Sequence, residues 1–147
     1  MPTRNTPETR RISTSGWVDL LDQVALRDAV AAFSPQYVIH LAARTDLDGE
    51  SSADYAANTV GTSNLILGLS SQAELRRVIF ASSMLGCRTG YRPTSETGYC
   101  PTRPYGKSKA ETEGLVRGST LIPCPWAMVR PTSIWGPWFG VPHKNFF

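Results

Sequence analysis

The sequence lacks the features that identify membrane proteins, nucleic-acid-binding proteins and metalloproteins. No stretch approaches the roughly 18 consecutive apolar residues that a membrane-spanning helix needs, so we expect no membrane span. The 15 lysines and arginines exceed the 12 aspartates and glutamates by three, an excess too small to indicate a nucleic-acid partner. The three cysteines, Cys87, Cys100 and Cys124, do not have metal-ligand spacing, which predicts no metal site.

Long targeting segments and disulfide frameworks are also missing. The cysteine count is odd and no apolar signal segment precedes the cysteines, which predicts a protein of the reducing cytoplasm. The first sixteen residues are rich in threonine, serine and arginine, as in a transit peptide. They show no amphipathic period, which favours an irregular segment instead. The 147 residues suffice for one domain and are too few for two.

The remaining chain alternates between strand-like and helix-like apolar patterns. Strands are expected at residues 17–20, 37–42, 78–81 and 127–130, and helices at 23–33, 51–69 and 105–117. Asp22 is expected to cap the first helix, and Ser51 or Ser52 the second. The run from 37 to 42 is almost wholly apolar, as in a strand covered on both faces. The order of elements predicts an α/β fold with a parallel sheet and helices on both faces.

Ligands of such sheets bind beyond the carboxyl ends of the strands. The residues to inspect therefore follow the expected strands, at positions 42–44, 82–84 and 131–133. A long loop from about 84 to 103, with two prolines and three glycines, follows one of these ends.

Tyr105 and Lys109 have a spacing that suits acid–base chemistry. Residues four apart lie on the same face of a helix. A phenol has a pKa of about 10, and a nearby ammonium favours the phenolate, which brings the pKa closer to neutrality. The spacing is a weak signal alone, because a solvated helix face whose first residue packs under a loop would look the same.

Ser83 follows an expected buried strand, and its hydroxyl could donate to a substrate oxygen. A serine that simply begins a turn is an equally simple interpretation. A role as a hydrolase nucleophile is disfavoured because no Gly-x-Ser-x-Gly elbow surrounds it. His40 lies within an apolar strand and is more typical of a core residue than of a base.

Asn58 lies in the middle of an expected helix among apolar neighbours. Asparagine is a poor helix former, so a buried one needs a hydrogen-bonding reason. We expect it to bond the backbone of a neighbouring helix. Gly61 in the same helix costs about 1 kcal/mol relative to alanine and indicates close packing there.

Together these segments resemble the extended short-chain dehydrogenase/reductase superfamily, in particular the NAD-dependent epimerase/dehydratase family that acts on nucleotide-sugars. The matching segments occur in the family's order at residues 18–22, 38–43, 58–62, 79–83, 105–109 and 130–137. Each segment alone is a weak signal, but the combination of all of them is specific to the family. The resemblance implies a Rossmann-like domain that binds NAD or NADP.

The resemblance implies a role for each matching residue. Tyr105 would exchange a proton with a substrate hydroxyl, and Lys109 would depress its pKa and hold the nicotinamide ribose. Ser83 would hydrogen-bond the same substrate oxygen, and Asn58 would support Lys109 through ordered water. Cofactor contacts would come from further residues: Asp19 and Leu20 at the adenine, Ala42 and Ala43 near the pyrophosphate, and Pro131 near the nicotinamide.

The family's glycine-rich cofactor turn is absent. The twelve glycines never have the spacing Gly-x-x-Gly-x-x-Gly or Gly-x-Gly-x-x-Gly. We therefore expect residues 1–147 to be a partial Rossmann-like domain that lacks the first βαβ unit and the C-terminal substrate domain, with residues 1–16 irregular. Residues 84–86, Met-Leu-Gly, replace a commoner Val-Tyr-Gly, which affects the expected substrate pocket more than the proton chemistry.

Two functions are compatible with this sequence. The first is an epimerase/dehydratase-type oxidoreductase acting on a nucleotide-sugar, present as a fragment that is inactive alone; a homo-oligomer is compatible with this function. The alternative is a non-enzymatic relic or binding module that pairs with another chain through its open sheet. The sugar, the choice between NAD and NADP, and the oligomeric state leave no readable signal.

Overall fold

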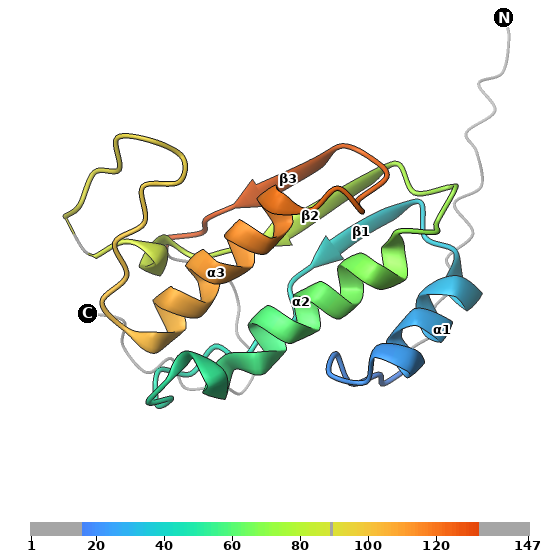
Figure 1. Ribbon diagram of the computed structural model, residues 1–147, viewed down its shortest axis with the longest axis horizontal. Helices are drawn as coiled ribbons and strands as arrows, with labels where there is room; N and C mark the ends of the chain where they lie inside the picture. The colour runs from blue at the N-terminus through green and yellow to red at the C-terminus, as the bar shows by residue number, and fades with distance from the viewer. Residues whose placement is uncertain (1–15, 89, 133–147) are drawn as a thin grey trace, which may run out of the picture.

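A computed structural model describes residues 16–88 and 90–132, which form a parallel sheet covered by helices (Figure 1). In chain order the elements are α1 (Gln23–Phe33), β1 (Tyr37–His40), the 3-10 helix η1 (Ser52–Tyr55), α2 (Ala56–Leu69), β2 (Arg77–Ala81), the 3-10 helix η2 (Met84–Gly86), α3 (Pro104–Gly118) and β3 (Trp126–Val129). The α/β fold class expected from the alternating patterns is confirmed.

The strands lie in the order β1-β2-β3, and all pairs are parallel. Ile39 pairs with Ile79, which in turn pairs with Ala127. Both crossovers, through α2 and α3, step in the same direction along the sheet. Because such crossovers are right-handed, both helices fall on the same face. In Figure 1, α1, α2 and α3 lie side by side on that face.

The core lies between this helix layer and the sheet. It consists of apolar side chains from α1, α2, β2, α3 and the segment before β2, namely Leu26, Leu65, Ile66, Leu69, Leu75, Val78, Phe80 and Val116. The opposite face of β1 is open, because Tyr37 and Ile39 are each 64% exposed. The sequence predicts helices on both faces, and the described residues supply them to one.

The helix boundaries follow local capping chemistry. The Asp22 carboxylate accepts a hydrogen bond from the Ala25 backbone N–H at 2.9 Å, as expected for the cap of α1. Ser34 ends α1 in a left-handed conformation with φ of 48°. The Asp54 carboxylate accepts from the Ser51 backbone N–H at 3.0 Å, which fixes the start of η1, and α2 follows directly.

Residues 17–20 do not form the expected strand, so that prediction is wrong. The Asp19 carboxylate accepts from the Leu21 backbone N–H at 2.9 Å, a local bond that favours a turn. The Leu20 carbonyl accepts from the Asn64 side-chain amide at 2.9 Å, which binds this turn to α2. Gly61 permits the approach, since a Cβ there would lie 2.9 Å from the Leu20 Cβ.

No helix in the described part of the chain is both long and apolar enough to cross a membrane.

Candidate active site at the carboxyl edge of the sheet

The carboxyl ends of β2 and β3 are held in line by backbone hydrogen bonds. The Ser82 N–H donates to the Val129 carbonyl at 2.7 Å, and the Met84 N–H donates to the Pro131 carbonyl at 3.2 Å. The first turn of α3 packs against η2 at the same edge, where Gly106 meets the Leu85 carbonyl. Ser83, which follows β2, therefore lies beside Tyr105, and Lys109 reaches the last residue of β2.

Tyr105 and Lys109 occupy the buried face of α3. Tyr105 is 8% exposed, and its ring meets Tyr55 edge to face with centroids 5.8 Å apart. Lys109 is 5% exposed, and its Nζ donates to the Ala81 carbonyl at 3.1 Å. The Lys109 Nζ lies 5.9 Å from the centre of the Tyr105 ring. The interpretation of a solvated helix face is therefore wrong for this pair.

Burial dominates the electrostatics of this pair. It raises the pKa of the Tyr105 phenol, while the neighbouring Ser83 hydroxyl acts in the opposite direction. Burial also lowers the pKa of the Lys109 ammonium. The resemblance implies that Lys109 depresses the Tyr105 pKa. In this conformation the Lys109 ammonium donates to the Ala81 carbonyl.

Ser83 is half-buried between β2 and η2. It is the N-cap of η2, and its Oγ accepts from the Leu85 backbone N–H at 3.1 Å. Both sequence interpretations therefore apply to its position, because the residue begins a turn and also lies beside Tyr105. The Ser83 hydroxyl hydrogen is not used by the Leu85 bond and can be donated to a ligand oxygen.

Asn58 joins three segments at the amino-terminal end of α2. It is 1% exposed; its Oδ1 accepts from the Arg44 N–H at 2.8 Å. Its Nδ2 donates to the Arg44 carbonyl at 3.1 Å and to the Ser108 hydroxyl at 3.0 Å. The backbone that Asn58 bonds is thus that of Arg44, after β1, and not that of a neighbouring helix as expected. Its bond to the neighbouring helix α3 is made to the Ser108 side chain. Asn58 consequently fixes α3 next to Lys109.

His40 is a core residue, as its position in an apolar strand predicts. It is 8% exposed; its Nε2 lies 3.2 Å from the Thr62 hydroxyl, and its ring meets Phe80 edge to face. Burial, with a smaller contribution from the Lys109 charge, lowers the pKa of His40 to about 4. The imidazole is therefore neutral at physiological pH.

The other expected cofactor contacts lie on separate segments around the sheet edge. Ala42 is exposed and Ala43 is half-buried directly after β1, and half-buried Pro131 follows β3. Asp19 and Leu20 lie on the turn before α1, where Asp19 is exposed and Leu20 packs on Gly61.

A nicotinamide dinucleotide would need a hydrogen-bonding site for its nicotinamide half and donors for its pyrophosphate. The Tyr105 phenol, the Lys109 ammonium and the Ser83 hydroxyl fit the first requirement. The starts of α1 and η1 do not fit the second requirement. The carboxylate of Asp22 caps α1 and that of Asp54 occupies the first turn of η1, and both would repel a pyrophosphate.

Sequence reasoning missed a buried ion cluster centred on Glu113, which is 1% exposed. Its carboxylate accepts from Arg130 Nε and Nη2 at 2.7 Å each and from the Tyr99 hydroxyl at 3.0 Å. Burial raises the pKa of Glu113, but the Arg130 bonds and other donors outweigh it and leave the pKa below its usual value. Its place one turn after Lys109, on the face that Tyr105 also occupies, is the signal that could have revealed it.

This cluster joins α3, the end of β3 and the long loop. Arg130 also donates to the Glu96 carbonyl and covers the Tyr99 ring at 5.3 Å. Arg130 immediately precedes Pro131, so the cluster fixes the carboxyl end of β3 relative to the helix that carries Tyr105.

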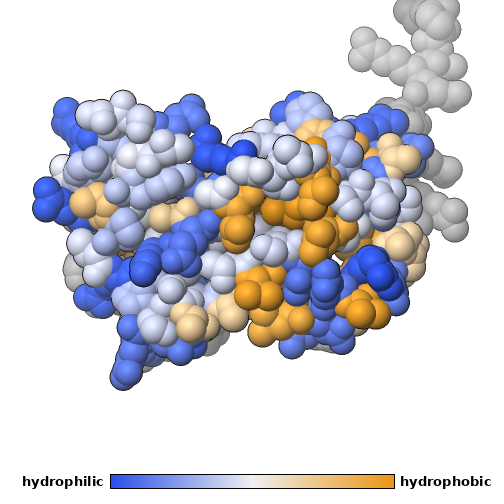
Figure 2. Space-filling model, in the orientation of Figure 1, coloured by the Kyte–Doolittle hydropathy of each residue, from blue (hydrophilic) through white to orange (hydrophobic). Residues whose placement is uncertain are grey.

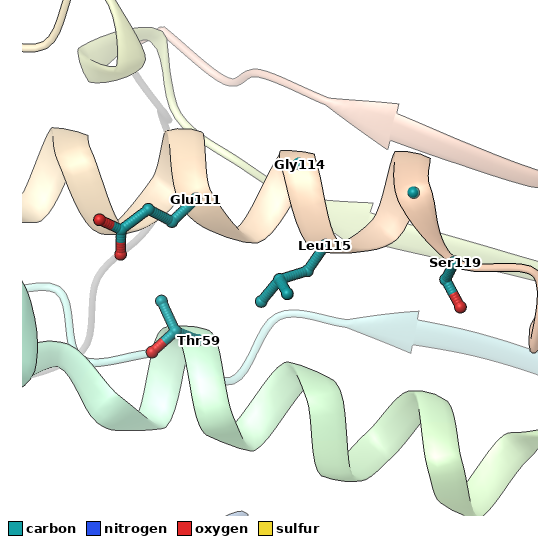
Figure 3. A pocket seen from close by; sticks show the side chains of 6 residues that line it. Thr59, Glu111, Gly114, Leu115 and Ser119 are labelled. Atoms are coloured by element: carbon teal, nitrogen blue, oxygen red, sulfur yellow. The ribbon is translucent and has the colours of Figure 1, made fainter.

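A shallow groove lies between α2 and α3, away from this edge (Figure 3). In Figure 3, Glu111 and Leu115 extend from α3 toward Thr59 of α2. These residues occupy the outward side of α3, whereas Tyr105 and Lys109 are on its buried side. Figure 2 shows apolar side chains gathered over the middle of this helix face. The groove is therefore separate from the candidate active site.

Among the described residues, no group of three or more histidines, cysteines, aspartates or glutamates could hold a metal ion.

Comparison with known proteins adds a family match to this geometry. The sequence model of the NAD dependent epimerase/dehydratase family matches residues 2–146. The chain is 35% identical over 102 residues to the UDP-glucose 4-epimerase of Mycoplasma genitalium, an alignment that covers 63% of this chain and 30% of that protein.

Solved structures with a similar fold include two epimerases in complex with NAD. The UDP-glucose 4-epimerase of Brucella ovis is 29% identical with a TM-score of 0.65, over 78% of this chain and 37% of that one. The UDP-glucose 4-epimerase of Thermus thermophilus is 26% identical with a TM-score of 0.62, over 77% of this chain and 39% of that one. The chain thus spans between 30% and 39% of the length of these relatives.

Proposed function

Because this chain belongs to the NAD-dependent epimerase/dehydratase family, we propose that it carries the proton-transfer residues of an oxidoreductase that acts on a nucleotide-sugar. One observation carries the proposal. Tyr105 and Lys109 are buried one helical turn apart, with the Lys109 Nζ at the carboxyl end of β2 beside Ser83. A buried tyrosine and lysine with a free hydroxyl nearby form a suitable set for moving a proton to and from an alcohol.

Each residue has a distinct task in this proposal. The Tyr105 hydroxyl exchanges a proton with a substrate hydroxyl, and Ser83 donates a hydrogen bond to the same oxygen. Lys109 leaves the Ala81 carbonyl to bind the nicotinamide ribose, which brings its charge closer to the phenol and favours phenolate. Asn58 holds α3 in place through Ser108. The bound nicotinamide cofactor, NAD or NADP, supplies reversible hydride transfer.

The nucleotide-sugar assignment is supported by the relatives. The Mycoplasma genitalium, Brucella ovis and Thermus thermophilus proteins are UDP-glucose 4-epimerases. The two solved structures contain NAD. We propose a nucleoside-diphosphate sugar as the substrate class of the active site to which this chain contributes.

The proposal is tested in a chimera that inserts residues 17–132 between the flanking segments of the Brucella ovis enzyme. Tyr105→Phe should lower turnover of UDP-glucose at least about a hundredfold and leave cofactor affinity nearly intact. Lys109→Ala should lower turnover and also weaken cofactor binding. Tyr37→Phe, on the open face of the sheet, makes the same chemical change and should alter neither. A folded, cofactor-bound chimera without turnover, or a fully active Tyr105→Phe variant, would contradict the assignment.

We also propose that the 147-residue chain alone binds NAD too weakly for catalysis. The pyrophosphate carries the charge of the cofactor, and related folds bind it at a glycine-rich turn before a helix. That glycine spacing does not occur in this sequence. Calorimetric titration of the chain with NAD should give no binding in the micromolar range. Micromolar binding by a monomer would show that another segment replaces the missing turn.

The alternative function, a binding module that pairs through its sheet, is favoured by one observation. Tyr37, Ile39 and Leu41 are each at least 64% exposed along β1 and the segment after it. Sedimentation of the purified chain separates the two functions. A stable dimer or hetero-complex, together with an inactive chimera, would favour the binding module.

A further inference from the structure

Cys87 and Cys100 lie opposite each other at the start and end of the long loop. They form an isolated parallel β-bridge, in which the Cys100 N–H donates to the Gly86 carbonyl at 3.0 Å. Adjacent strands lie about 4.8 Å apart, and residues paired in register project to the same side. A disulfide spans Cα separations of about 4.4–6.8 Å. The backbone thus already has the separation that a disulfide requires.

The side-chain position of Cys87 agrees with the backbone. Its Sγ lies 3.5 Å from the Gly98 carbonyl and is therefore directed across to the segment that contains Cys100. Both thiols are free and half-buried, so a small reagent can reach them.

Cys124 provides an internal comparison. It precedes β3, whose residue Trp126 pairs with Val78 at the start of β2, whereas Cys87 follows the end of β2. The sheet therefore separates Cys124 from the other two thiols by the length of a strand.

We propose that Cys87 and Cys100 are a site of reversible oxidation, in which a low-molecular-weight disulfide such as oxidised glutathione converts the two thiols into a disulfide. In the first step a Cys87 thiolate attacks glutathione disulfide, a protein–glutathione bond forms, and one glutathione leaves. In the second step the Cys100 thiolate attacks the Cys87 sulfur and releases the second glutathione. The protein loses two electrons and two protons, and glutathione disulfide gains them as two thiols.

The disulfide would fix a segment that borders the candidate active site. Gly86, next to Cys87, belongs to η2, which Ser83 caps. The Leu85 carbonyl packs so closely on Gly106, next to Tyr105, that a Cβ there would collide with it. Oxidation would therefore link Cys87 to Cys100 covalently beside η2, which contacts the first turn of α3.

Equilibration of the 147-residue chain in glutathione redox buffers tests the site. Intact mass should fall by two hydrogen atoms, and peptide mapping should find Cys87 joined to Cys100. Cys124→Ser should behave in the same way. Cys87→Ser and Cys100→Ser should instead retain one glutathione on the remaining partner. The measured quantity is the ratio of the squared concentration of reduced glutathione to the concentration of oxidised glutathione at which half of the chain is oxidised. This ratio should be at least about tenfold higher for the folded chain than for the chain in concentrated urea, because the fold holds the two thiols together.

Three results would overturn the proposal. These are a disulfide that involves Cys124, a wild-type chain that keeps glutathione adducts on Cys87 and Cys100, or the same redox ratio with and without urea. Circular dichroism of each sample establishes whether the chain is folded during the measurement, and a chain that is unfolded without urea counts against the proposal.

Discussion

The free energy of unfolding depends on the protonation state of the buried His40 side chain. Its pKa is lowered from 6.5 to about 4, so the folded chain binds this proton less tightly than the unfolded chain does. Acidification below the unfolded-state pKa of 6.5 therefore favours unfolding. The stability that the neutral imidazole contributes is completely lost only below about pH 4. The stability contributed by the neutral imidazole is fully present near neutrality.

We expect the free energy of unfolding to fall by about 2 kcal/mol from pH ~7 to ~5 because of His40. Urea unfolding monitored by circular dichroism at both pH values measures this difference. His40→Asn removes the titrating imidazole, so the free energy of unfolding of this variant should change little between the two pH values. This expectation holds whatever the effect of the substitution on stability near neutrality. An equal fall in the wild-type chain and in the variant would assign the pH dependence to other groups.

The positions and contacts of some site residues can be predicted from the sequence, and those of others cannot. The face shared by Tyr105 and Lys109 follows from helical spacing, and the need of Asn58 for hydrogen bonds follows from its poor helix propensity. The Glu113–Arg130 pair was not predicted, because it joins residues from α3 and β3 whose proximity depends on the tertiary fold. The orientation of Lys109 toward the Ala81 carbonyl also depends on where the neighbouring strand ends.

Of the three glycines of helix α3, Gly106 and Gly114 have opposite surroundings. Gly106 is buried under η2, where an added Cβ would collide with the Leu85 carbonyl and approach Pro101. Gly114 has no atom within 4 Å of an added Cβ. The same substitution therefore tests packing at one position and helix propensity at the other.

Gly106→Ala should lower the free energy of unfolding by about 1–3 kcal/mol, because η2 must move away from α3. Gly114→Ala should raise it by about 0.5–1 kcal/mol, because alanine loses less conformational entropy in a helix. Denaturant unfolding of both variants beside the wild-type chain measures the two effects. Stabilisation by Gly106→Ala would contradict the close contact between η2 and α3.

Among the elements, the helices were better predicted than the strand expected at residues 17–20. Asp22 and the apolar period locate α1, and Pro104 begins α3 as prolines do in first turns. Residues 17–20 have the apolar content of a strand, but the Asp19 carboxylate and the Asn64 amide satisfy their backbone as a turn. Local composition does not reveal a hydrogen bond from a residue more than forty positions away.

Among the described residues, helices cover one face of the sheet, and the other face is open at β1. The parallel sheet follows from the alternation of elements, and the common side of α2 and α3 follows from right-handed crossovers. The run from 37 to 42 predicts a strand covered on both faces, yet Tyr37 and Ile39 are exposed. Its apolar residues indicate that this face can be buried.

The open face should make the isolated chain bind apolar dyes. Ile39→Thr keeps a β-branched residue in β1 and should reduce the fluorescence of 8-anilinonaphthalene-1-sulfonate and the light scattering of the solution. Val24→Thr, at a 58% exposed position on α1, is the matched control and should change both signals less. Equal effects of the two substitutions would show that the open sheet face is not the main apolar surface.

The order of the strands in space equals their order along the chain. Among the three described strands, each therefore docks beside the one made just before it, and none is inserted between two others. During synthesis on a ribosome, β1 and β2 can pair and be covered by α2 before α3 and β3 have emerged. From β1 to β3 the sheet can thus grow in one direction, with each of the two βαβ crossovers completed as a unit while translation continues.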